Sequence, residues 1–476
     1  MSNEDNYQNP LTHRYASSEM SANWSPRKKF GTWRSLWVAL AETQQELGLE
    51  ITDEQIEQMR RNVDNLNLER AEEIEQDLRH DVMSHIRAFA EQCPQASPVI
   101  HLGATSCFVT DNSELIQLRD GLQILTGKLE KLINALRSFS LEYKDLPTLG
   151  FTHFQPAQLT TVGKRASLWL YDFALDLEEL RSLHNELPFR GAKGTTGTQA
   201  SFLELFEGNE ENVQELDRRI AEKMGFNHAV PVCGQTYTRK FDHKILSTLS
   251  GIAQSAAKMC NDIRLLAHMN ELQEPFGRKQ VGSSAMAYKQ NPMRSERVCS
   301  LARYVVSLYT NAAETHSHQW LERTLDDSAN RRLSLPQAFL GTDAILSLLS
   351  TITSGIQVWP RVIEQNIRRE LPFMATENIL MSCTKAGGDR QSLHEAIRTH
   401  ALAAKKRMKE EGAENDLLDR IRGDARFAAI HDCLDEIVAP EKFTGRAAEQ
   451  AEEFVSAYID PLLAEADTDE EETDEQ

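Results

Sequence analysis

The chain has 476 residues, of which 40% are hydrophobic and 26% charged, a balance typical of folded globular proteins rather than disordered ones. Its net charge of -20 argues against nucleic acid as a partner, because phosphate backbones are bound by clustered cations. The sequence shows neither an uninterrupted apolar run of membrane-spanning length nor the basic and apolar start of a signal peptide, so we expect no membrane association and a cytoplasmic location.

Residues 1–105 are predicted to form a helical N-terminal domain. Within it, Thr52-Asp53-Glu54-Gln55 is a capping-box pattern, which predicts that a helix begins there. The segment R-H-D-V-M-S-H, from Arg79 to His85, places its histidines five residues apart, whereas the zinc motif H-E-x-x-H places them four apart. This spacing favours a solvated helix face over a metal site.

The segment L-G-A-T-S-C-F-V-T-D-N, from Leu102 to Asn112, gathers hydroxyl side chains beside a glycine. Thr105 and Ser106, together with nearby backbone amides, are suited to an anion pocket. The same segment suits a loop that leads into a helix capped at Asn112 or Ser113. The segment alone does not distinguish the two interpretations.

The segment F-T-H-F-Q-P-A-Q, from Phe151 to Gln158, places His153 between two aromatic residues. We expect a helix to begin at the proline that follows, Pro156. Histidine has a pKa suited to proton transfer at neutral pH, so His153 is a candidate acid or base. A lone histidine is more often a hydrogen-bonded structural residue, and this alternative remains open at the level of the motif.

Three later stretches carry apolar residues at spacings of three and four, which predicts long helices. They run from Leu168 to Leu187, from Phe241 to Asn270 and from Val298 to Ala312. Such apolar stripes are buried where long helices pack together. We therefore predict an all-α fold in which residues 106–358 form a central helical bundle.

Two glycine-containing segments interrupt these helices. R-G-A-K-G-T-T-G, from Arg190 to Gly197, lacks the preceding strand of a dinucleotide-binding motif, so its glycines are interpreted as allowing a tight turn. G-S-S-A-M-A-Y-K-Q-N-P, from Gly282 to Pro292, matches neither a Walker loop nor a G-x-S-x-G elbow. It suits a mobile loop that closes over a substrate, and equally a surface linker.

The segment E-R-T-L-D-D-S-A-N-R-R, from Glu322 to Arg332, concentrates cations in a strongly acidic chain. Arg323, Ser328, Arg331 and Arg332 are suited to grip a phosphate through forked hydrogen bonds. This cluster therefore indicates a ligand that carries a phosphate.

The C-terminal region, residues 359–476, is predicted to form a third helical domain. Proline interrupts a helix, so Trp359-Pro360 is expected to end the bundle. Acidic residues dominate from about residue 465, which predicts a disordered tail. Throughout the chain, the seven cysteines are scattered and lack a C-x-x-C pair, which indicates reduced, mostly buried thiols.

The runs T-S-x-x-x-T-D-N, F-T-H-F-Q-P-A-Q and G-S-S-A-M-x-Y-K-x-N-P, in this order, resemble the three signature regions of the fumarase/aspartase superfamily. Three further runs, M-R-S-E-R, E-R-T-L-D-D-S-A-N-R-R and L-P-F-M-A-T-E-N, resemble the adenylosuccinate lyase family in its animal form. The resemblance extends from about Arg14 to about Leu463.

The resemblance implies a homotetramer in which each active site draws on three subunits. It also implies two steps of purine biosynthesis that release fumarate, one from adenylosuccinate to give AMP and one from succinylaminoimidazole carboxamide ribotide to give the free amide. Small purine nucleotides are the expected ligands, and neither a metal nor an organic cofactor is expected.

By position, the resemblance assigns Ser283 as the general base and His153 as the general acid, whereas residue types alone leave His80 as an alternative proton donor. Lys289 is the expected cation that activates Ser283. Residues expected to hold the nucleotide, mainly its phosphate, are Arg14, Tyr15, Arg323, Ser328 and Arg332. Residues expected to complete the substrate pocket are Arg79, His80, Asp81, Thr105, Ser106, Thr152, Gln235, Lys289, Asn291 and Arg297.

Two positions depart from the family pattern. Ala287 stands where the superfamily usually has proline, which would stiffen the loop, and Gln290 stands where the animal enzymes often have a basic residue. Two other functions remain open to test: a sibling lyase such as argininosuccinate lyase or fumarase, and a catalytically silent helical scaffold. The cluster from Arg323 to Arg332 and the pair Arg14-Tyr15 argue against the sibling. The presence of His153, Ser283 and Lys289 together argues against the scaffold.

Overall fold

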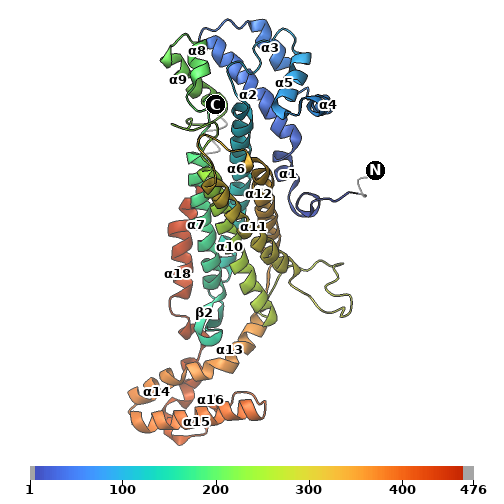
Figure 1. Cartoon of the computed structure of the whole chain (residues 1–476). Helices are drawn as coiled ribbons and strands as arrows, with labels where there is room; N and C mark the ends of the chain where they lie inside the picture. The colour runs from blue at the N-terminus through green and yellow to red at the C-terminus, as the bar shows by residue number, and fades with distance from the viewer. Residues whose placement is uncertain (1–5, 465–476) are drawn as a thin grey trace. The chain divides into compact units, whose positions relative to one another are not determined.

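The computed structural model describes residues 6–464 (Figure 1), so the tail expected from about residue 465 lies outside the described residues. Helices dominate these residues, which confirms the predicted all-α class. Elements up to residue 223 are η2 Leu11–Tyr15, α1 Ser18–Asn23, α2 Pro26–Glu46, α3 Asp53–Asn62, α4 Leu68–Leu78, α5 Asp81–Gln92, α6 Ser106–Glu142, β1 Pro147–Thr152, β2 Gln155–Thr161, α7 Val162–Glu186, α8 Ala200–Leu205 and α9 Glu210–Lys223. The later elements are α10 Lys240–His268, β3 Leu272–Gln273, α11 Met293–Ser317, α12 Asp326–Thr353, β4 Gln357–Val358, α13 Pro360–Met374, α14 Thr376–Lys385, α15 Arg390–Glu410, α16 Leu417–Arg422, η3 Ala425–Cys433, α17 Leu434–Ile437, η4 Pro440–Phe443, α18 Ala447–Phe454 and η5 Val455–Ile459.

The chain forms two compact units, each assembled from stretches that are separated in sequence. The first unit comprises Met1–Leu129, Asp176–Ala257 and Val298–Leu348. The second comprises Glu130–Leu175, Lys258–Arg297 and Leu349–Gln476. The three domains predicted from the sequence are continuous stretches of chain with boundaries at residues 105 and 358. The two units are discontinuous in sequence, so the three-domain division stays a prediction.

The N-terminal part of the first unit is organised around α2. Trp33 and Trp37 lie one turn apart on this helix and are both buried. Figure 1 shows α8 and α9 beside α2, and Lys223 of α9 forms an ion pair with Glu46 of α2 at 2.8 Å. The predicted capping box is present at the start of α3, where Thr52 and Gln55 exchange side-chain-to-backbone hydrogen bonds. Local capping signals in the sequence therefore mark a real helix start.

The three predicted long helices are present as α7, α10 and α11, and each begins slightly before its apolar pattern. The residues that define the pattern are buried, as Ile245, Leu249 and Ile252 of α10 illustrate. Another long helix, α12, is long and apolar enough over an 18-residue window to cross a membrane by length and composition alone. Within the protein, 67% of that window is buried, as in a core helix.

One local prediction is wrong, and one of the two interpretations of the Leu102–Asn112 segment is excluded. No helix begins at Pro156, because Phe151 to Gln158 form an antiparallel β-hairpin of β1 and β2, and α7 begins only at Val162. Neither Asn112 nor Ser113 caps a helix, because α6 already begins at Ser106 and both residues are buried within it.

The second unit contains the β1–β2 hairpin and a helical lobe formed by α13 to α17. Ile379, Leu393, Ile421 and Phe427 form part of the lobe's hydrophobic core. The segment between β3 and α11, which contains Gly282 to Pro292, runs as an irregular loop. The hairpin and this loop carry the candidate acid and base.

Candidate functional site

Part of the predicted site is assembled in the first unit, where the segment before α10 meets the segment before α12. The backbone N–H of Gln235 donates to the carbonyl of Glu322 at 3.0 Å. Gly234 permits this approach, because a Cβ there would lie 2.5 Å from the same carbonyl oxygen. The two segments therefore hold Gln235 close to Arg323, although 88 residues separate them in sequence.

Cys107 connects these residues to the N-terminus of α6. Arg323 donates from Nη1 to Cys107 Sγ at 2.7 Å, and Sγ lies 3.8 Å from Gln235 Oε1. Burial and the nearby Asp111 raise the pKa of the Cys107 thiol to about 11, so it is neutral at physiological pH. Thr105 and Ser106 directly precede it in the chain. The structure thus brings Gln235, Arg323 and the Thr105-Ser106 segment together around a thiol that sequence reasoning missed.

A buried ion-pair network fixes the start of α12 behind this site. Arg239 pairs with Asp111 at 3.1 Å and with Asp327 at 2.7 Å. Burial would raise the pKa of Asp111, but Arg239, Arg331 and other arginines overcome this effect and lower it. Asp327 lies in the first turn of α12 and precedes Ser328, so the network sets the position of that turn.

Arg331 belongs to this network and not to the ligand-facing surface. Its guanidinium pairs with Asp242 at 2.6 Å and with Glu114 at 2.5 Å, and it donates to the hydroxyl of Tyr237. The side chain of Arg331 is 5% exposed. The proposed use of Arg331 to grip phosphate is therefore wrong, because carboxylates already occupy its guanidinium.

Arg332 lies next in sequence but points to a different partner. Its guanidinium forms an ion pair with Asp81 at 3.3 Å, and its side chain is 56% exposed. Arg79 ends α4 in the left-handed conformation, and His80 caps α5 by accepting a hydrogen bond from the Met83 N–H at 3.3 Å. This turn between α4 and α5 presents Arg79, His80 and Asp81 together and brings Asp81 to Arg332.

The N-terminal residues of the predicted nucleotide site are held on α12. Arg14 and Tyr15 end η2, and the guanidinium of Arg14 lies 5.9 Å from the centroid of the Tyr15 ring. Two residues later, Ser17 donates its N–H and its hydroxyl to the carboxylate of Asp343, at 2.6 and 3.0 Å. The same buried carboxylate pairs with Lys128. Asp343 thus positions the segment that carries Arg14.

His153 lies at the tip of the β1–β2 hairpin in the second unit. Both His153 and Phe154 adopt positive φ angles, 51° and 56°, as the tight turn between paired Thr152 and Gln155 requires. The imidazole is exposed, and within residues 6–464 it makes no hydrogen bond. The hairpin therefore presents the histidine ring outward, where a ligand can reach it.

Ser283 lies on the irregular loop before α11, with its hydroxyl oxygen held by backbone amides. Ser283 Oγ accepts hydrogen bonds from the N–H groups of Ala285 at 3.3 Å and Met286 at 3.1 Å. The side chain of Asn291 donates to the carbonyl of Gly282 at 2.8 Å and so ties the two ends of the loop together. Lys289 is exposed on the same loop.

The base of this loop is anchored by a buried carboxylate. Glu274 accepts hydrogen bonds from the N–H groups of Arg294 and Ser295, each at 2.9 Å, at the start of α11. Negative charge is favourable at a helix N-terminus, which stabilises this junction. Arg297, on the first turns of α11, is held partly buried just beyond it. Sequence reasoning missed Glu274 because nothing in its local pattern marks it as a cap.

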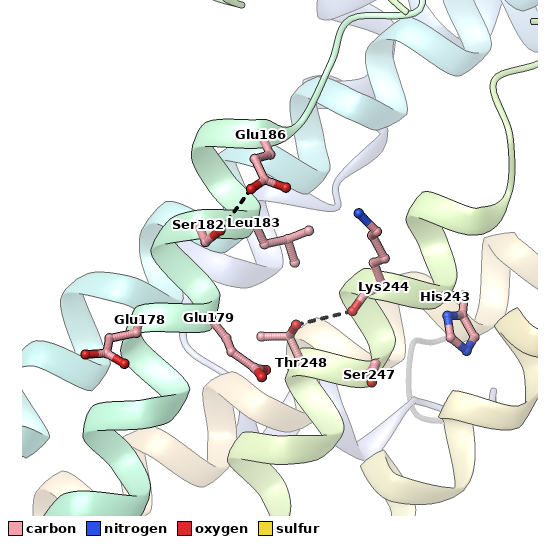
Figure 2. Close-up of a pocket in the computed structure, with 9 residues that line it drawn as sticks. All are labelled: Glu178, Glu179, Ser182, Leu183, Glu186, His243, Lys244, Ser247 and Thr248. Carbon is pink, nitrogen blue, oxygen red and sulfur yellow. Dashed lines mark hydrogen bonds between the residues drawn. The ribbon is translucent and has the colours of Figure 1, made fainter.

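The groove shown in Figure 2 is not part of this assembly. It has a volume of about 470 Å³, lies between α7 and α10, and contains none of the predicted site residues. Its hydrogen bonds are local, from Ser182 to Glu186 and from Thr248 to the carbonyl of Lys244. Its lining residues are Glu178, Glu179, Ser182, Leu183, Glu186, His243, Lys244, Ser247 and Thr248. Three glutamates against one lysine make it a poor place for an anionic ligand.

Comparison with protein families gives two matches. Residues 12–307 match the family described as "Lyase", and residues 372–454 match the family described as "Adenylosuccinate lyase C-terminus". Together these matches cover most of the described chain.

Curated relatives match over nearly the whole length. The chain is 54% identical over 466 residues to adenylosuccinate lyase of Saccharomyces cerevisiae, with 97% of each protein covered. It is 52% identical over 467 residues to adenylosuccinate lyase of Schizosaccharomyces pombe, which covers 98% of this chain and 97% of the relative. Among solved structures, 3-carboxy-cis,cis-muconate lactonizing enzyme from Pseudomonas putida superposes with a TM-score of 0.81 at 21% identity. It covers 94% of this chain and 98% of that one, and at such low identity the likeness concerns the fold alone.

Proposed function

The chain belongs to the adenylosuccinate lyase family and is a carbon–nitrogen lyase, and from this premise we propose how its residues carry out the reaction. The enzyme eliminates fumarate from adenylosuccinate and leaves AMP. The same elimination from succinylaminoimidazole carboxamide ribotide leaves the free amide. In both, Ser283 removes a proton from the succinyl carbon beside a carboxylate, and His153 protonates the departing nitrogen.

The observation that carries this proposal is the hydrogen bonding of Ser283. A serine hydroxyl is a poor base at its ordinary pKa and must be converted to an alkoxide. The backbone N–H groups of Ala285 and Met286 already donate to Ser283 Oγ, and the same two donors favour the negatively charged oxygen. The ammonium of Lys289, on the same loop, adds a positive charge that stabilises both the alkoxide and the substrate carboxylates.

Proton removal builds negative charge on the substrate carboxylate, so donors fixed around that carboxylate lower the barrier. Lys289 supplies a cation for this purpose, and Thr152 supplies a hydroxyl from the hairpin that carries His153. The role of Asn291 is chiefly to hold the loop, since its amide is engaged by Gly282. Closure of the loop then excludes water and strengthens each of these interactions.

The nucleotide portion of the substrate is bound by the cluster in the first unit. The phosphate is bound by Arg323, Ser328 and Arg332. Arg323 is held in place by its hydrogen bond to Cys107, and Ser328 lies on the first turn of α12. Arg14 and Tyr15 extend this grip. Gln235, Thr105, Ser106 and the Arg79–Asp81 turn complete the pocket in the first unit. Arg297, which lies in the second unit, is assigned to the same substrate by resemblance. One nucleotide site serves both substrates, because both carry the same ribose phosphate.

The enzyme acts as a homotetramer whose active sites are shared between subunits. Large apolar side chains are exposed just before Arg323 in the chain, with Trp320 at 74% and Leu321 at 98% exposed. Phe154 beside His153 and Tyr288 beside Lys289 are exposed as well. Neighbouring exposed apolar residues such as Trp320 and Leu321 are typical of interaction surfaces, which supports contact between subunits near Arg323.

Mixing two inactive variants tests the shared site. His153→Ala and Ser283→Ala, each inactive alone, are expected to regain part of the activity when unfolded together and refolded as mixed tetramers. Some sites in such tetramers draw an intact histidine from one subunit and an intact serine from another, and these sites are a minority. Each variant refolded alone provides the control. Verified mixed tetramers without activity above either parent would assign both residues to one subunit.

A further inference from the structure

A second cavity in the first unit reaches one of the nucleotide residues. It has a volume of about 250 Å³ and lies between α2 and α12. Arg332 is part of its wall, whereas the groove of Figure 2 contains no residue of the site. The other lining residues are Trp24, Ser25, Pro26, Lys29, Phe30, Glu114, Gln117, Arg331, Leu335 and Pro336. This cavity therefore combines aromatic and proline walls with three cations.

Lys29 enters this cavity from the first turn of α2 without a polar partner. Its ammonium lies 5.5 Å from the ring centroid of Phe30 and 5.4 Å from that of Trp33. Within residues 6–464, the ammonium makes neither a hydrogen bond nor an ion pair. An ammonium has three donors, so the two aromatic faces compensate only part of the cost of removing it from water. The preceding Lys28, by contrast, pairs with Asp120 at 2.6 Å.

A second unused donor lies in the wall of the same cavity. The indole N–H of Trp24 is buried and has no hydrogen-bond partner among the described residues. A buried donor without an acceptor is destabilising, and few occur in native proteins. The unused donors of Trp24 and Lys29 together indicate that a ligand with hydrogen-bond acceptors occupies this cavity when substrate is bound.

The charges that face Lys29 leave the cavity positive. Burial lowers the pKa of Lys29, and the positive charge of Arg332 lowers it further. The carboxylates of Glu114, Asp81 and Glu75 act in the opposite direction. Glu114 is already engaged by Arg331 at 2.5 Å. Lys29 is thus the cation of this cavity without a carboxylate partner, whereas Arg332 pairs with Asp81 at 3.3 Å and its side chain is 56% exposed. An anion bound in the cavity would balance the charge on Lys29 and would also meet the exposed part of Arg332.

We propose that Lys29 is a further anchor of the nucleotide's 5′-phosphate and acts together with Arg332 across this cavity. The inference rests on the proposed function, which places that phosphate beside Arg332. Arg332 presents a planar fork of donors and Lys29 a compact point charge, so the two can bind different oxygens of one phosphate. The apolar walls formed by Trp24, Phe30 and Pro336 lower the local dielectric around Lys29 and so strengthen its interaction with the phosphate.

Lys29→Met tests this role, because methionine retains most of the aliphatic stem and removes the charge. Calorimetry with AMP and with adenosine, which lacks the phosphate, separates the phosphate from the rest of the ligand. We expect Lys29→Met to weaken AMP binding by about tenfold or more, since hydrogen bonds to charged groups contribute about 1.5–3 kcal/mol. Binding of adenosine should be unchanged. KM for adenylosuccinate should rise while kcat stays near its original value.

Three comparisons complete the experiment. Lys29→Arg keeps the charge and should bind AMP nearly as well as the original protein. Lys28→Met is the matched control, because it removes a lysine charge from the neighbouring position outside the cavity and should leave AMP binding unchanged. Lys29→Gln is a second neutral variant that replaces Lys29→Met if that protein does not fold. Unfolding midpoints and oligomeric state are measured for each protein.

Equal losses for AMP and adenosine in Lys29→Met, or no loss for either, would overturn the assignment of Lys29 to the phosphate. These results are distinguishable from failure of the proposed function itself. If the original protein bound AMP and turned over adenylosuccinate while Lys29→Met did both equally well, only the role of Lys29 would be wrong. If the original protein did neither, the proposed function would be wrong first.

Discussion

Replacement of Ser283 by alanine is expected to lower kcat for adenylosuccinate by about 10² to 10⁴, the usual contribution of a general base or acid. The variant loses the oxygen to which Ala285 and Met286 donate, so no alkoxide can form. His153→Ala should lose activity over a similar range, because the departing nitrogen is then not protonated by the enzyme. Steady-state kinetics on both purified variants gives these values.

Ser284→Ala is the matched control for Ser283→Ala. Ser284 lies next in the same loop and is exposed, and its hydroxyl is no part of the proposed mechanism. Its kcat should remain close to that of the original enzyme. AMP binding by Ser283→Ala should also be retained, because the nucleotide residues lie in the first unit. A kcat of Ser283→Ala comparable with that of Ser284→Ala would remove Ser283 from the role of base.

The second large effect concerns stability. Arg331→Met is expected to destabilise the protein by about 3–5 kcal/mol, because removal of one partner of a buried ion pair leaves the other charge buried and uncompensated. Here Asp242 and Glu114 would each lose the guanidinium that pairs with them, and Asp242 would keep the hydrogen bond that the Tyr237 hydroxyl donates at 2.6 Å. Denaturant and thermal unfolding, followed at equal protein concentration because the protein is proposed to be oligomeric, measure the change.

Arg218→Met provides the comparison for Arg331→Met. Arg218 pairs with Glu215 and Glu222 on the surface of α9, where solvent screens the charges, so its loss should change the midpoint little. Both changes remove one positive charge and insert methionine. A difference between their unfolding midpoints therefore reports whether the arginine is buried or exposed. Similar midpoints for the two variants would contradict the assignment of Arg331 to a stabilising core network.

Periodic and capping patterns predicted the helices well, because they depend on neighbouring residues. The apolar spacing of α10 and the capping box at Thr52 are both present in the structure. The hairpin at His153 was mistaken for the start of a helix at Pro156. Its turn is defined by the positive φ angles of His153 and Phe154 and by strand pairing, neither of which a proline pattern reveals.

Site residues were predicted mainly through resemblance, and the structure adds what spacing cannot supply. Arg331 and Arg332 are adjacent in sequence, yet one is engaged by buried carboxylates and the other is half-exposed. Helix geometry turns consecutive residues to different faces, and only the packing of α12 decides which face is buried. Cys107 was likewise missed, because its contact with Arg323 spans 216 residues.

The most direct test of the central claim is the turnover of adenylosuccinate by the purified chain. We predict that AMP and fumarate appear in equal amounts, that succinylaminoimidazole carboxamide ribotide is cleaved as well, and that Ser283→Ala abolishes most of both activities. Argininosuccinate should not be cleaved. An assembled, folded protein that leaves adenylosuccinate intact, or that cleaves argininosuccinate in its place, would contradict the account.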